Sequence, residues 1–240
     1  MHEQRAFVLH TRPFKENQQL VELLTEDQGK VSALVYVGQS KRSIKKALLQ
    51  PFLPITLALK GQGTSLKRIT TIDATAKSFP LSKDHLYSAF YINELLVKLL
   101  NDEIACEYLF SHYQAALLAL SQGLEIAQQL RQFELVLLDE LGLSFDFSPV
   151  FAEQPKHVVG FYFLPEEGFM PAYQYSVNKI TTPWFSIEHI QSIAEHVLDG
   201  KVLVHQGAKH TFKLLMRDVF NHLLDGKVLN SRQLFTKNKR

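Results

Sequence analysis

The most chemically distinctive part of the sequence is a basic stretch, YVGQSKRSIKKALLQPF, at residues 36–52. It holds four cations within six positions: Lys41, Arg42, Lys45 and Lys46. No acidic residue occurs from residue 28 to residue 72. Lysine and arginine gathered on one connection offer positive charge and hydrogen-bond donors to phosphate oxygens, as in proteins that hold nucleic-acid backbones. The alternative interpretation is a solvated loop with no ligand.

Further cations are predicted at strand ends or beside a turn, where they would border the same surface: Arg12, Lys30, Lys67 and Arg68. Single-strand binding also needs flat side chains on which bases stack. Phe7, Phe14 and Tyr36 are the candidates. We expect Phe7 to pack in the core, whereas for Tyr36 core packing and base stacking both stay open.

The formal net charge of +2 hides a strong asymmetry along the chain. Residues 1–80 carry 12 Lys and Arg against 6 Asp and Glu, residues 81–199 carry 5 against 16, and residues 200–240 carry 9 against 2. This pattern indicates that the ends of the chain meet a polyanion and the middle does not, the alternative being solvated faces of differing sign. Phosphate contacts in the basic C-terminal part are predicted at Lys209, Lys213, Arg217 and Arg232. They would either join the basic face of the first 80 residues or hold phosphate separately.

The sequence contains no motif of a catalytic or metal centre that outweighs a structural explanation. It has no Walker loop, GxSxG or HExxH, and the glycines at 61 and 63 fit a hairpin turn. His189 and His196 share a helix face without a supporting carboxylate cluster. Cys106, the only cysteine, is predicted to be a buried apolar residue. We therefore predict a protein that is not an enzyme and uses neither cofactor nor metal.

The first 80 residues show the pattern of a small β-barrel. Five short apolar runs, separated by turn residues, are predicted as strands at 5–13, 18–26, 30–38, 53–61 and 66–76. The second run also fits a helix. Gly29, in the turn EDQGK, suits a positive φ.

The pattern changes to a helical period after Pro80. Helices are predicted at 86–100, 107–120, 125–141, from Pro183 to Leu198, and at about 207–224. The predicted class is α+β, with a five-stranded barrel at 1–80 and a mainly helical domain at 81–240. That second domain includes an irregular, cysteine-free insert at about 144–182, with strand-like pieces at 158–164 and 169–175. The lack of a secretory signal, a membrane span or paired cysteines favours the cytoplasm.

Several segments in order resemble the RecO family of DNA repair proteins. They are RAFVLHTRPFKENQQLVELLTEDQGKVSALVYVGQSKRS, LQPFLPITLALKGQG, LYSAFYINELLVKLL, RQFELVLLDELG and LNSRQLF. The resemblance covers most of the chain and is weakest at 145–205. It implies an N-terminal OB barrel, a helical domain and a non-enzymatic recombination mediator associated with the nucleoid. Such a protein binds single- and double-stranded DNA, anneals complementary strands, binds RecR and the C-terminal tail of single-strand-binding protein, and helps RecA to load.

The chain departs from the family pattern in one respect. Many members carry a four-cysteine zinc module after the third helix, but residues 144–175 contain no cysteine, so a Cys-type zinc site is excluded by ligand count. We expect aromatic packing to hold this segment instead, by Phe145, Phe147, Phe151, Phe161, Tyr162 and Phe163.

The family resemblance also implies a site for an acidic, apolar peptide tail. Arg131 is the only Lys or Arg between Lys98 and Lys156, and it begins an apolar run. A guanidinium beside apolar side chains suits a terminal carboxylate next to a hydrophobic residue. The predicted site comprises Arg131, Phe133, Leu135 and Leu138. A salt bridge from Arg131 to Glu134 or Glu94 is the alternative.

We therefore predict a DNA-binding and annealing protein whose contacts are mainly to phosphates, with low sequence specificity. The main alternative is a protein-interaction adaptor whose basic patches bind acidic protein tails. A nuclease is disfavoured because the clustered carboxylates of two-metal chemistry are missing.

Overall fold

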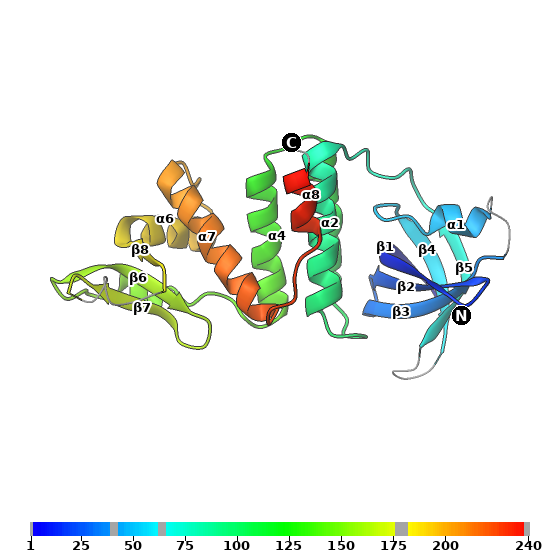
Figure 1. Ribbon diagram of the computed structural model, residues 1–240, viewed down its shortest axis with the longest axis horizontal. Coiled ribbons are helices and arrows are strands. Elements are labelled where there is room, and N and C mark those ends of the chain that lie inside the picture. Colours follow the sequence, from blue (N-terminus) through cyan, green and yellow to red (C-terminus); the bar gives the residue numbers. More distant parts are fainter. Residues whose placement is uncertain (1, 39–42, 62–65, 176–181, 238–240) are drawn as a thin grey trace. The chain divides into compact units, whose positions relative to one another are not determined.

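A computed structural model describes residues 2–38, 43–61, 66–175 and 182–237 (Figure 1). The chain forms two compact units, one made of residues 1–142 with 228–240 and the other of residues 143–227. The first unit therefore contains the barrel, the following helices and the end of the chain. The change from strands to helices near residue 80 lies inside it.

The N-terminal strands form a closed barrel. Its strands are β1 (Glu3–Phe14), β2 (Gln18–Thr25), β3 (Gly29–Tyr36), β4 (Ile55–Lys60) and β5 (Lys67–Ala74). They are ordered β1-β2-β3-β5-β4, and β4 pairs back onto β1. All neighbours are antiparallel except β3 and β5. The predicted five-stranded OB-type barrel and α+β class are confirmed.

Alternation along the strands explains why this sequence closes into a barrel. Val21, Leu23, Ala33 and Val35 point inward into a core of buried aliphatic side chains, so the residues between them face outward. The run at 18–26 is a strand and not a helix, because β2 pairs along its length with both β1 and β3. A short helix, α1 (Ile44–Leu48), was not predicted, and it lies within the basic stretch.

Four helices complete the first unit. They are α2 (Lys83–Leu99), α3 (Glu107–Ser121), α4 (Ile126–Glu140) and α8 (Ser231–Lys237). The first three match the predicted helices closely. The last begins where Glu94 of α2 accepts hydrogen bonds from the backbone N–H groups of Asn230 and Ser231, both at 2.9 Å. A side chain of α2 therefore satisfies the open N–H groups at the start of α8.

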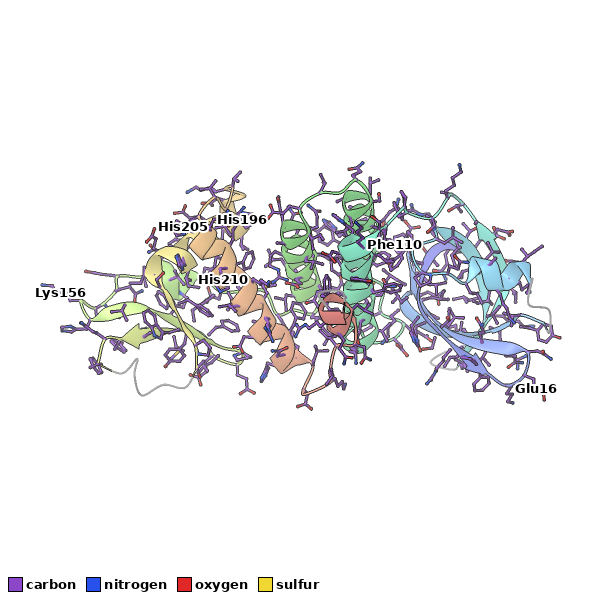
Figure 2. The ribbon with its side chains drawn as sticks, turned by 45° about the horizontal axis from the view of Figure 1, so that its top comes forward. Glu16, Phe110, Lys156, His196, His205 and His210 are labelled. Atoms are coloured by element: carbon purple, nitrogen blue, oxygen red, sulfur yellow. The ribbon has the colours of Figure 1, made fainter. Side chains whose placement is uncertain are left out.

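The barrel packs on α2 and α3 through aromatic and polar contacts. The ring of Phe7 lies 5.6 Å from that of Phe110 and 5.1 Å from that of Tyr113, centroid to centroid, and Figure 2 shows Phe110 between barrel and helices. The expected core role of Phe7 is confirmed by its exposed fraction of 1%. Asn93 donates to the carbonyl of Leu9 at 3.0 Å and accepts from the Tyr113 hydroxyl at 2.7 Å.

Gly29 allows the turn between β2 and β3 to approach the helical part closely. Its φ is +66°, and a Cβ built at this position would lie 1.8 Å from the carbonyl oxygen of Ile104. Both the backbone conformation and the lack of space therefore require glycine here.

The second unit combines a three-stranded sheet with three helices. Its elements are α5 (Ser148–Phe151), β6 (Val158–Leu164), β7 (Gly168–Tyr173), β8 (Trp184–Ser186), α6 (Ile187–Asp199) and α7 (Gln206–Leu223). The two strand-like pieces appear as β6 and β7. The helix predicted to start at Pro183 starts four residues later, because β8 comes first and the Ser186 side chain accepts from the N–H of His189 as the cap.

Aromatic side chains form the core of this second unit. Phe145, Phe147, Phe163 and Phe169 contact one another with centroid distances of 5.1 to 5.8 Å. Phe161 is also buried, whereas Phe151 is half exposed. The segment without cysteines is thus held by aromatic packing. None of the helices in the described residues is both long enough and apolar enough to cross a membrane.

Candidate nucleic-acid interface

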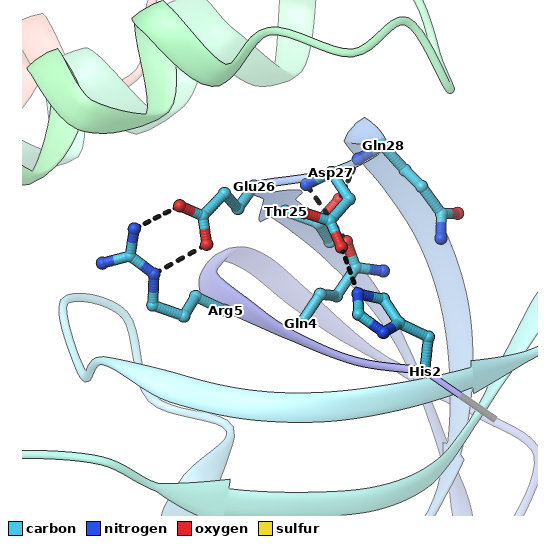
Figure 3. Close-up of polar contacts among 7 residues, drawn as sticks. All are labelled: His2, Gln4, Arg5, Thr25, Glu26, Asp27 and Gln28. Atoms are coloured by element: carbon cyan, nitrogen blue, oxygen red, sulfur yellow. Dashed lines mark hydrogen bonds and ion pairs between the residues drawn. The ribbon is translucent and has the colours of Figure 1, made fainter.

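One end of the barrel is occupied by a polar clamp that holds the β2–β3 turn against β1 (Figure 3). The Arg5 guanidinium donates two hydrogen bonds to the Glu26 carboxylate, from Nε to Oε2 at 2.7 Å and from Nη2 to Oε1. This hydrogen bond keeps the pKa of the Glu26 carboxyl below its ordinary value. The ring of His2 lies 3.0 Å from the Asp27 carboxylate, and Gln4 accepts from the Asp27 N–H. This end of the barrel lies at the helices, with the Arg5 guanidinium carbon 5.5 Å from the centroid of the Phe110 ring of α3.

Two of the predicted DNA-binding cations lie at this same barrel end and bind acidic residues that follow α2. Lys30 Nζ lies 3.1 Å from the Asp102 carboxylate and donates to the carbonyl of Val97, also at 3.1 Å. Lys67 Nζ lies 3.1 Å from the Glu103 carboxylate. Their side chains are only 12% and 10% exposed. Because their charges are taken up inside the protein, we assign Lys30 and Lys67 a structural role and leave them out of the proposed DNA surface.

The outer face at the other end of β1, β2 and β3 carries a row of exposed aromatic residues. Phe14 pairs with Gln18, and Gln18 pairs with Tyr36. Phe14 is 36% and Tyr36 is 60% exposed. With strands about 4.8 Å apart, the two rings stand roughly 10 Å from each other on one face. Tyr36 is therefore a surface residue and not part of the core.

A second row, two residues further along the strands, carries two arginines on the same face. Arg12 pairs with Leu20, Leu20 with Leu34, and Leu34 with Arg68. Both arginines are exposed. Of the two leucines between them, Leu34 is half-buried and Leu20 is buried, with 8% of its surface exposed. Lys15 extends the positive charge, since its Nζ lies 5.7 Å from the centroid of the Phe14 ring. Glu16, next in the hairpin, marks the barrel end remote from Phe110 (Figure 2).

We call these two rows, with Lys15, the outer barrel face. It comprises Arg12, Phe14, Lys15, Gln18, Leu20, Leu34, Tyr36 and Arg68. It offers what a single strand requires, namely cations for phosphates beside flat or apolar surfaces for bases. Sequence reasoning missed Lys15 and the leucines as members of this face. The position of Lys15 next to Phe14 in the hairpin could have indicated Lys15, whereas the leucines join the face only through the strand register.

The basic stretch lies only partly within the described residues. Lys45 and Lys46 are half-buried in the last turn of α1, next to the exposed Ile44. Lys41 and Arg42 fall outside the described residues.

The C-terminal cations divide between the two units. Lys209, Lys213 and Arg217 follow one another at intervals of four residues on α7, which places them on one helix face in the second unit. Arg232 belongs to the first unit, where its guanidinium carbon lies 5.8 Å from the centroid of the Tyr91 ring.

The predicted peptide-tail site is built around an internal ion pair. The Arg131 Nη2 donates to Glu134 Oε1 at 2.6 Å, and the Tyr91 hydroxyl donates to the same oxygen at 2.7 Å. The salt bridge to Glu134, which was the alternative, is thus present. Phe133 and Leu138 are 2% and 1% exposed and belong to the core, whereas Leu135 is half-buried.

Glu134 is the most strongly perturbed acid among the described residues. Burial raises the pKa of its carboxyl to about 7, against the opposing effects of Arg131, Tyr91 and Arg232. Its second carboxylate oxygen has no hydrogen-bond partner among the described residues. Burial, with the charge of Glu140, likewise raises the pKa of the Cys106 thiol to about 11, so this cysteine stays protonated at neutral pH.

No arrangement of metal-ligating side chains is found in the parts of the chain that the structure covers. No group of three or more His, Cys, Asp and Glu there could hold a metal ion. His189 hydrogen-bonds Thr211 at 2.9 Å, and its ring lies 5.1 Å from that of His205. His205 uses Nδ1 to accept from the N–H of Ala208 at the start of α7. These imidazoles serve the packing of α6 on α7.

The fold and the outer barrel face define a class: an OB-barrel protein with a surface suited to nucleic acid, joined to a helical bundle. Comparison with known proteins gives the family. Residues 1–77 match the model for the recombination protein O N terminal, and residues 82–169 match that for its C terminal. The chain belongs to the RecO family.

Curated relatives match over nearly the whole length. The DNA repair protein RecO of Tolumonas auensis is 38% identical over 240 residues, covering 96% of this chain and 93% of the relative. Those of Haemophilus influenzae and Psychromonas ingrahamii are 34% and 33% identical. The match to the Haemophilus influenzae protein covers 98% of this chain and 96% of the relative. The match to the Psychromonas ingrahamii protein covers 96% of each.

Proposed function

We propose that this protein binds single-stranded DNA on the outer barrel face and acts in DNA repair as a recombination mediator. The observation that carries the proposal is the pairing register, which sets Phe14 and Tyr36 beside Arg12 and Arg68 on one exposed face. Rings and guanidinium groups at this spacing suit bases and phosphates of one strand. Phosphate contacts dominate, so we expect low sequence specificity.

Annealing of complementary strands follows from the same chemistry without a catalytic group. Cations lower the repulsion between phosphates and concentrate two strands, and base pairing supplies the driving force. The cations of α7, Lys209, Lys213 and Arg217, are proposed as a second phosphate contact in the other unit, for single- or double-stranded DNA. Lys45 and Lys46, with Lys41 and Arg42, are proposed to extend the first.

The protein partners that we propose are RecR and the C-terminal tail of single-strand-binding protein, with RecA acting downstream. For the acidic tail, we retain Arg131 and Leu135 as contact residues, with the buried Phe133 and Leu138 as the packing behind them. A titration with a fluorescein-labelled acidic peptide ending in Phe tests this site. Saturable binding that Leu135→Glu abolishes would support it, and unchanged binding in Leu135→Glu would contradict it.

The test of DNA binding is fluorescence anisotropy of a labelled oligo-dT across a salt series. The variant Arg12→Ala/Arg68→Ala removes two charges from the outer barrel face, and Lys156→Ala/Lys227→Ala removes two exposed charges from the second unit. Each phosphate contact contributes about −0.7 to the slope of log affinity against log salt. The arginine variant should therefore flatten the slope by about 1.4, and the lysine control should leave it unchanged.

Two results would oppose the proposal. If both double variants had the same slope as the unaltered protein, the outer barrel face would not contact phosphates. If the unaltered protein bound no oligonucleotide at low salt, the adaptor alternative would explain the basic residues better.

A further inference from the structure

The strand β1 contains one extra residue halfway along its pairing with β2. Val8 pairs with Leu23, but the next pair is His10 with Glu22, so Leu9 is the extra residue. Such an insertion is a β-bulge, which bends its strand and re-aims the side chains that follow. The bulge therefore divides β1 into two parts whose side chains face different ways.

The bulge decides which side chains of β1 reach the outer barrel face. Ala6 and Val8 point into the barrel core. Because side chains alternate along a strand, uninterrupted pairing would turn Arg12 and Phe14 inward as well. With Leu9 as the extra residue, both point outward instead. The two side chains that the proposed DNA surface takes from the body of β1 therefore depend on the bulge.

Beyond the bulge, β1 has fewer neighbours to hold it. The strand β4 pairs with β1 only from Glu3 to Ala6, and a single bridge joins Val8 to Pro51. Within the described part of the chain, residues 10–14 pair with β2 alone. We call residues 10–14 the outer segment of β1. Its position is set by β2 along one edge and by the bulge at its start.

The helical part of the first unit holds the bulge through a buried amide. Asn93 of α2 is 2% exposed, and its Nδ2 donates to the carbonyl oxygen of Leu9 at 3.0 Å. Its Oδ1 accepts from the hydroxyl of Tyr113 of α3 at 2.7 Å, and Tyr113 is fully buried. A buried carbonyl without a donor is costly, and the bulge interrupts the ladder that would otherwise supply one.

Asparagine suits this position because its side chain donates and accepts at the same time. The hydroxyl of Tyr113 binds the carbonyl end of the Asn93 side chain, which leaves the amide end directed at Leu9. Leucine has a similar size but would leave both the Leu9 carbonyl and the Tyr113 hydroxyl without a hydrogen bond. The three groups therefore act as one unit that fixes the bulge from the helices.

We propose that Asn93, oriented by Tyr113, is a positioning residue for single-stranded DNA. By holding the bulge at Leu9, it keeps Arg12 and Phe14 on the outer barrel face. The inference rests on the proposed function, because it concerns the surface assigned there to the DNA. Since Asn93 and Tyr113 are buried, they act on the DNA only through the outer segment of β1.

Anisotropy titrations with labelled oligo-dT test this role. Asn93→Leu should weaken binding at least about fivefold, because the outer segment then adopts the binding arrangement only part of the time. Tyr113→Phe, which removes the group that orients Asn93, should weaken binding about two- to threefold. Tyr91→Phe is the matched control, since it also removes a buried hydroxyl bond of 2.7 Å, here to Glu134, and should bind normally.

Hydrogen exchange measured by mass spectrometry separates positioning from a general loss of stability. In Asn93→Leu, exchange should become faster in a peptide covering residues 9–20, while peptides from α4 stay as protected as in the unaltered protein. In Tyr91→Phe the peptide 9–20 should keep its protection. Exchange that rises equally in the barrel and the helices of Asn93→Leu would mean a merely structural role and would overturn the proposal.

The variant Tyr113→Phe keeps the test decisive if Asn93→Leu does not fold, because it removes a single oxygen atom. Unchanged oligo-dT affinity in the folded Asn93→Leu, or in Tyr113→Phe where the first does not fold, would overturn the positioning role while the proposed function stands. If the unaltered protein bound no oligo-dT, the proposed function itself would fail, and the DNA role of Asn93 with it.

Discussion

Replacement of the buried Glu134 by glutamine should change how the stability of this protein depends on pH. Burial places the pKa of the Glu134 carboxyl at about 7 in the folded chain, against 4.5 as its ordinary value. The folded state therefore keeps a proton that the unfolded state has already released at neutral pH. This stabilising contribution is fully present below pH 4.5 and is lost as the pH rises through 7.

The linkage relation gives the size of the effect. Between pH 5 and pH 8 the carboxyl lowers the free energy of unfolding by about 2–3 kcal/mol, since 1.36 kcal/mol corresponds to each pH unit between the two pKa values. Glutamine resembles the protonated acid in shape and cannot ionise. The difference in unfolding free energy, unaltered protein minus Glu134→Gln, should therefore fall by about 2–3 kcal/mol across this range.

Urea unfolding of both proteins at pH 5, 6, 7 and 8, followed by far-ultraviolet circular dichroism, measures this difference. Glu153→Gln, at an exposed position, is the control and should show a constant difference. A difference that rises with pH would mean that Arg131, 2.6 Å from Glu134, outweighs burial and holds the carboxyl ionised. That result would refute the reasoning.

Three further changes test the site and the fold. Tyr36→Ala should weaken oligo-dT binding by about 1–3 kcal/mol in anisotropy titrations, because it removes a stacking ring, whereas Tyr36→Phe should bind normally; equal losses would exclude stacking. Gly29→Ala should lower the unfolding free energy in urea by more than about 2 kcal/mol, since its Cβ would meet the Ile104 carbonyl and its φ is positive; a smaller loss would show that the turn adjusts easily. His205→Ala should cost about 1 kcal/mol in the same assay, because α7 loses the acceptor for the Ala208 N–H, and His205→Asn should restore it; no recovery would argue against a capping role.

The sequence by itself determined the order and type of most elements. Alternating apolar residues and turn glycines predicted five strands before residue 80, and the helical period predicted the helices after it, because both patterns follow from how side chains alternate along one element. Gly29 was predicted to suit a positive φ for the same local reason. The helix α1 escaped prediction because five residues show too little periodicity.

Only the tertiary structure decided which charged and aromatic residues share a surface. Lys30 and Lys67 resemble the other cations of the first 80 residues, but Asp102 and Glu103, far along the chain, neutralise them. Arg12 and Arg68 come to one face through the parallel pairing of β3 with β5. Such neighbours depend on strand register and on contacts between distant segments. Composition and sequence spacing indicate neither the strand register nor the contacts between distant segments, because a side chain's charge does not indicate what will lie opposite it.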